Sequence, residues 1–67
     1  MSYYETTFQV WEVDADGDRV SQIPICTMRD KRTAIDHART LGLKRFNVMQ
    51  ESESPDGCAS QCVHMER

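Results

Sequence analysis

The stretch FQVWEVDADGDRVSQIPI (residues 8–25) decides the fold of this chain. Its two ends are rich in β-branched and aromatic residues, and they flank an acidic run with one glycine, which is the pattern of a β-hairpin. Glycine takes a positive φ without steric cost, so we expect Asp16 and Gly17 at the centre of a two-residue turn. That turn predicts four facing pairs: Asp14 with Arg19, Val13 with Val20, Val10 with Ile23, and Phe8 with Ile25.

This register makes the hairpin apolar on both faces. Large apolar residues line one face: Phe8, Val10, Ile23 and Ile25. The opposite face carries further apolar side chains between two glutamines: Trp11, Val13 and Val20 beside Gln9 and Gln22. One short helix covers a single sheet face, so we expect the second face to meet another part of the chain or a partner.

A helix is predicted after the hairpin. Its start near residue 30 is explained either by a capping box over residues 27–30 or by Asp30 as the N-cap. Its apolar stripe repeats with helical spacing and consists of Ala34, Ile35, Ala38 and Leu41. Gly42 suits the C′ position that ends a helix, and Leu43 can then fold back over the last turn.

Alternating apolar residues return in residues 45–51 and predict a third strand. A right-handed crossover makes this strand antiparallel to the first, which gives the strand order 2-1-3, and Pro24 suits an edge position for the second strand. The expected fold class is α+β, with a small three-stranded antiparallel or mixed sheet of ββαβ topology and one helix on one face. We expect the helix to cover Phe8, Val10, Ile23, Ile25, Phe46 and Val48. The open face is expected to show Trp11, Val13, Val20, Cys26, Met28 and Met49.

We take residues 1–51 as the ββαβ domain. Residues 52–67 differ from it in composition. They are rich in Ser, Glu, Pro, Asp and Gly, as a linker or tail would be. Ser54 and Pro55 also suit the N-cap and N1 positions of a short C-terminal helix. Two interpretations are open: a frayed tail, or a second helix docked on the open sheet face.

Composition restricts the class of protein. Only 39% of the 67 residues are hydrophobic, and no apolar run is long enough to span a membrane. The opening residues MSYYETT lack the basic flank and apolar segment of a signal peptide, so we expect a cytoplasmic protein with no membrane partner. Neither His37 nor His64 belongs to a nucleophile motif, and no Gly-rich phosphate loop is present, so we expect no enzyme and no cofactor.

Residues 14–18 begin like an EF-hand calcium loop, with acids at alternate positions. Arg19 stands where that loop needs glycine, and Ile25 where it needs a bidentate glutamate. We therefore interpret this segment as a solvated hairpin turn.

Three cysteines and one histidine supply the atoms of a Cys₃His zinc site: Cys26, Cys58, Cys62 and His64. The paired knuckles that structural zinc sites use are missing, so we expect no bound metal. A small metal-binding protein is the lesser alternative.

Charge is segregated along the chain, although the net charge is only −3. Residues 29–45 hold six basic side chains against two acidic ones, and the segments on either side are acidic. The candidate surface for an anion or an acidic partner consists of Arg29, Lys31, Arg32, Lys44 and Arg45. Nucleic-acid binding through this helix is the alternative function, weakened because Trp11 lies among acids rather than among basic residues.

The expected function is non-catalytic: stoichiometric binding to a larger protein or complex, as an adaptor or inhibitor. Small modules of this kind are common among phage and plasmid accessory proteins, including inhibitors of host defence. Aromatic residues and methionine are enriched at interface centres, which makes the open face the expected site. The predicted partner-binding residues are Trp11, Val13, Val20, Gln22 and Met49. A second copy of the chain, in a homodimer, is the other candidate to cover this face.

Overall fold

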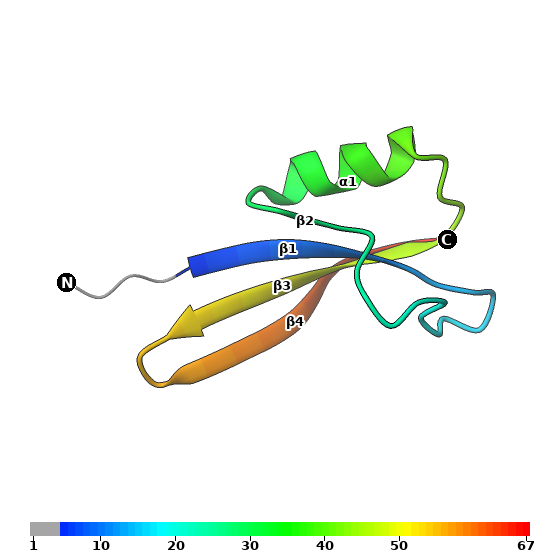
Figure 1. Cartoon of the computed structure of the whole chain (residues 1–67). Helices are drawn as coiled ribbons and strands as arrows, with labels where there is room; N and C mark the ends of the chain where they lie inside the picture. Colours follow the sequence, from blue (N-terminus) through cyan, green and yellow to red (C-terminus); the bar gives the residue numbers. More distant parts are fainter. Residues whose placement is uncertain (1–4) are drawn as a thin grey trace.

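A computed structural model describes residues 5–67, which form a four-stranded antiparallel sheet with one helix on one face (Figure 1). The elements in chain order are β1 (Glu5–Glu12), β2 (Cys26–Met28), α1 (Lys31–Thr40), β3 (Phe46–Ser54) and β4 (Gly57–Glu66). The strand order is β2-β1-β3-β4. The α+β character and the order of the first three strands agree with the sequence-based prediction. The prediction of a three-stranded sheet is wrong, because the C-terminal residues add a fourth strand.

β4 occupies the region expected to be a frayed tail or a short helix. A two-residue loop joins β3 to β4, with Ser54 facing Gly57 across it. Ser54 Oγ donates a hydrogen bond of 3.1 Å to the Gly57 carbonyl, and Gly57 has a φ of 137°. A serine, a proline and a glycine at these positions suit a β-turn as well as a helix start. The predicted C-terminal helix is therefore wrong, and the turn residues carry the chain back along β3.

The first hairpin forms around a larger turn than predicted. The Asp14 N–H donates to the Asp18 carbonyl at 2.9 Å, and the Gly17 N–H donates to the Asp14 carbonyl at 3.0 Å. Gly17 has a φ of 89°, which completes a three-residue loop with a glycine bulge. Asp14 Oδ1 accepts from the N–H groups of Asp16 and Asp18, so the aspartate side chain stabilises the wider turn.

The strand register changes in two steps: the wider turn shifts the first pair by one residue, and residues 20–25 then leave the ladder and shift the pairs of β2 further. Val13 pairs with Arg19 instead of Val20. Further along β1, Val10 pairs with Cys26 instead of Ile23, and Phe8 pairs with Met28 instead of Ile25. A shift by an odd number of residues moves side chains to the opposite face. Cys26 and Met28, expected on the open face, instead pack against the core, whereas Ile23 is 71% exposed.

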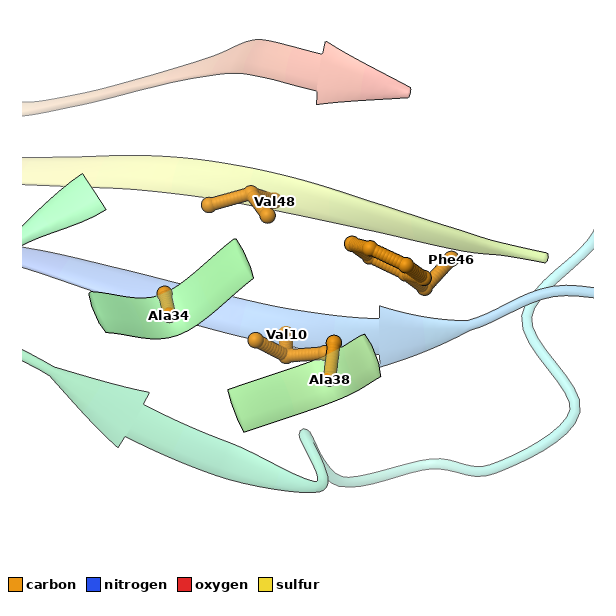
Figure 2. Packing of buried hydrophobic residues seen from close by; sticks show 5 residues of the cluster. All are labelled: Val10, Ala34, Ala38, Phe46 and Val48. Carbon is orange, nitrogen blue, oxygen red and sulfur yellow. The ribbon is translucent and has the colours of Figure 1, made fainter. Parts of the chain in front are cut away.

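The core lies between α1 and the sheet (Figure 2). Its fully buried members come from both layers: Val10, Ala34, Ala38, Phe46 and Val48. The two alanines keep the helix surface flat, so it packs closely on the strand side chains. Leu41 was expected in this stripe but is half exposed, and Leu43 packs against the core from beyond the helix end.

Both ends of α1 follow from local sequence. Asp30 is the N-cap, and its Oδ2 accepts from the Thr33 N–H at 2.9 Å, which selects one of the two predicted starts. At the other end, Gly42 has a φ of 78° and donates its N–H to the Arg39 carbonyl. The Leu43 N–H donates to the Ala38 carbonyl, which completes the predicted glycine cap.

Among residues 5–67, no helix is both long and apolar enough to cross a membrane. Residues 1–4, part of the opening segment in which we expect no signal peptide, lie outside the described residues.

Candidate protein-binding surfaces

Trp11 lies on the sheet face opposite α1, yet only 8% of it is exposed. The guanidinium carbon of Arg19 lies 3.8 Å from the centre of the indole ring, a cation–π contact. The indole N–H donates to Gln9 Oε1 at 3.2 Å. The side chain that covers this ring therefore belongs to the segment after the first turn, and not to a C-terminal helix.

The other predicted partner-binding residues fall into different environments. Val13 is buried beside Trp11, and Val20 and Gln22 are exposed on the segment that follows Arg19. Met49 is partly buried on β3, where it faces Gln9. Of these residues, Trp11 and Val13 are thus buried, whereas Val20 and Gln22 are exposed.

Residues 19–25, here named the apolar loop, carry three exposed aliphatic side chains that the predicted register partly assigned to the core. Val20 is 53% exposed, Ile23 71% and Ile25 37%. The loop is attached to β1 at both ends, because the Val20 N–H donates to the Glu12 carbonyl at 3.1 Å and the Ile25 N–H to the Val10 carbonyl at 2.8 Å. Pro24, which we expected on an edge strand, lies before β2; its missing N–H is the sequence signal that could have indicated that this segment leaves the ladder.

The open sheet face is acidic at the end away from the apolar loop. A shallow depression of about 350 Å³ lies there, lined by Glu5, Thr7, Gln9, Glu51, Ser52, Glu53 and Cys58. The Ser60 hydroxyl donates to the Glu51 carboxylate. Three carboxylates on one surface disfavour an anionic partner here.

The five residues of the predicted basic surface lie in two groups. Arg29, Lys31 and Arg32 are exposed at the start of α1, whereas Lys44 and Arg45 are exposed beyond its end. A ten-residue helix is about 15 Å long, so the two groups are separated by roughly that length.

The surface of α1 between these two groups carries both signs of charge. A depression of about 440 Å³ on the helix is lined by Asp30, Lys31, Arg32, Ile35, Asp36 and Arg39. Arg39, in turn, forms an ion pair of 2.7 Å with Glu66 of β4. The structure therefore does not join the basic residues into one continuous patch.

The cysteines are separated by the sheet. Cys58 and Cys62 are exposed thiols four residues apart on β4, which places them about 13 Å from each other along a strand. Cys26 packs against the core, and burial raises the pKa of its thiol. Within the described residues, no three His, Cys, Asp or Glu side chains converge as metal ligands would.

His64 lies on the helix side of β4. Its ring centre is 5.8 Å from that of Phe46, and its Nε2 is 3.3 Å from Glu66 Oε1. The ion pair with Arg39 holds the pKa of Glu66 below its usual range. This cluster links the end of β4 to α1, which is a structural role.

Comparison with known proteins gives no relative for this chain: no family model matches it, and no curated protein or solved structure shows significant similarity. Its function must therefore be argued from its own surfaces.

Proposed function

We propose that this protein is a non-catalytic module that binds a larger protein or complex stoichiometrically, as an adaptor or inhibitor, through the apolar loop. The observation that carries the proposal is the exposure of three aliphatic side chains, Val20, Ile23 and Ile25, on one short loop attached to β1 at both ends. Full burial of such a side chain contributes about 1.5–3 kcal/mol, so even partial burial of three gives a useful binding free energy.

The surroundings of the loop support the same function. At its first residue the Arg19 guanidinium packs on the buried Trp11 indole, which anchors this end of the loop, so less conformational freedom is lost on binding. Beside it, residues 14–18 carry three aspartates, which favour a partner whose apolar pocket has a basic rim. None of the three cysteines is in a disulfide, which fits the reducing cytoplasm in which we expect the protein to act.

The test is affinity capture from an extract of the organism that encodes the chain, using full-length tagged protein and two variants. Ile23→Glu places a charge in the apolar loop, and Leu41→Glu makes the same change at an exposed leucine at the end of α1. We expect wild type and Leu41→Glu to retain one stoichiometric partner and Ile23→Glu to lose it. With the purified partner, Ile23→Glu should show an affinity at least tenfold weaker than that of wild type. Equal capture by all three proteins would overturn the proposal.

A further inference from the structure

β4 is an edge strand with unusual features for that position. It pairs with β3 on one side, and no other strand of residues 5–67 pairs with its second side (Figure 1). Exposed edges are commonly protected by charged side chains or proline. Residues 57–65 contain no Lys, Arg, Asp, Glu or Pro. α1 packs on β1, β2 and β3, so it does not cover this edge.

The hairpin geometry identifies the main-chain groups that point outward from β4. A two-residue loop is closed by a hydrogen-bonded pair, here Ser54 and Gly57. Hydrogen-bonded residues alternate along an antiparallel ladder, so Cys58, Ser60 and Cys62 direct their N–H and C=O groups away from β3. A bulge opposite Val48 and Met49 ends this regular stretch.

We propose that β4 pairs antiparallel with β4 of a second copy of this chain, about a two-fold axis at Ser60, to form one continuous sheet. An antiparallel edge is complementary to itself, since each outward N–H meets an outward C=O of the other copy. Centring on Ser60 is the register that pairs all three outward residues. It places Ser60 opposite the partner's Ser60 and Cys58 opposite the partner's Cys62.

The surroundings of the edge fit this second copy. The side chains from residue 58 to residue 62 are small or flexible and all exposed, so they leave room for a neighbouring strand. The two-fold axis is perpendicular to the sheet, so both helices lie on the same face and do not collide.

Sedimentation of the full-length protein over a wide concentration range tests the association. Ser60→Lys places two like charges opposite each other at the axis, and charged residues are a natural protection of strand edges. We expect wild type to form dimers and Ser60→Lys to weaken dimerisation at least tenfold. Thr40→Lys, the same charge change at an exposed residue of α1, should dimerise like wild type. Wild-type protein that stays monomeric at all concentrations would overturn the proposal.

Thiol cross-linking tests the register. Diamide accepts two electrons and two protons when a pair of thiols becomes a disulfide. In the proposed register wild type forms a linked dimer, whereas Cys58→Ser or Cys62→Ser alone does not, because the remaining thiols are about 13 Å or more apart. A mixture of the two variants should recover the linked dimer, since Cys62 of one faces Cys58 of the other. Efficient linking of either variant with itself would show random collision or another register and overturn the proposal. Cys26 is partly buried and is common to all samples.

Discussion

At the scale of single residues, Trp11 is the side chain whose burial has the largest consequence for stability. Its ring is 8% exposed under Arg19, so we expect Trp11→Ala to lower the free energy of unfolding by about 3–5 kcal/mol. Arg19→Ala removes a cation–π contact at an exposed position and should cost only about 0.5–1 kcal/mol. Urea denaturation measures both values.

Quenching of tryptophan fluorescence tests whether Arg19 shields the Trp11 indole from solvent, independently of its effect on stability. Arg19→Ala should make the indole more accessible to acrylamide while the fold persists, because the guanidinium lies over the ring. A Trp11→Ala variant with wild-type stability would contradict the burial of this residue and return Trp11 to the binding surface.

Asp30 makes a second residue-scale prediction, which concerns pH. Hydrogen bonds from the Thr33 N–H and hydroxyl stabilise the carboxylate and lower the pKa of Asp30 in the folded protein. The contribution of this group to stability is therefore complete above the unfolded aspartate pKa of ~3.9 and is lost as pH falls through the lower folded value.

Thermal melts followed by circular dichroism test this dependence. Asp30→Ala should melt below wild type at neutral pH, and the difference should shrink in acid. Asp30→Asn keeps a good N-cap without the titrating group, so it should lose less stability at neutral pH. An Asp30→Ala difference that is constant from acid to neutral pH would show that the carboxylate charge does not contribute.

At the scale of elements, local signals were sufficient for α1, β1 and β3. The caps at Asp30 and Gly42 each involve residues close in sequence, and the alternation around Phe46 gives one face of a strand. The register of β2 was wrong for two reasons: the side chain of Asp14 stabilises a wider turn, and residues 20–25 leave the ladder between the Val13–Arg19 and Val10–Cys26 pairs. β4 was missed because its first six residues are exposed on both faces, so this stretch needs no apolar alternation.

The same physical reasons limited prediction of the proposed binding surface. Val20 and Gln22 were expected as strand residues on the open sheet face; both are exposed, but they lie in the segment that precedes β2. A symmetric hairpin places Ile23 and Ile25 in the ladder, whereas residues 20–25 leave it between the Val13–Arg19 and Val10–Cys26 pairs, which exposes both isoleucines.

Removal of β4 is the prediction that belongs to this scale. Truncation after Ser54 removes the partner strand of β3, the packing of Val63 and the Arg39–Glu66 ion pair, so we expect no cooperative thermal transition. Within the full chain, Val63→Ala should cost about 1 kcal/mol, whereas Cys62→Ala at the exposed neighbour should cost less. Calorimetry measures all three. A truncated chain that melts like the full protein would show that β4 is dispensable.

At the scale of the whole molecule, the apolar loop and the β4 edge lie in different parts of the sheet. The loop connects β1 to β2, and β2 and β4 form opposite edges. A dimer through β4 would therefore leave both apolar loops free and would present two binding surfaces to one assembly. Simultaneous use of both surfaces would raise the apparent affinity without new contacts. Ser60→Lys should then weaken capture of a multivalent partner while leaving binding to an isolated partner domain unchanged.

The charge distribution of the whole molecule predicts weak, unselective binding of nucleic acid. The basic residues form two groups separated by the length of α1, and the open sheet face carries Glu5, Glu51 and Glu53. Each group neutralises two or three phosphates at most, so the logarithm of the binding constant should fall with the logarithm of salt with a slope of about −2 to −3. Anisotropy titrations with labelled DNA and RNA at several salt concentrations measure this slope. Lys44→Glu with Arg45→Glu should lower binding equally for every sequence. Tight, sequence-dependent binding at physiological salt would instead favour the basic helix as the functional surface, because phosphate contacts alone cannot distinguish sequences.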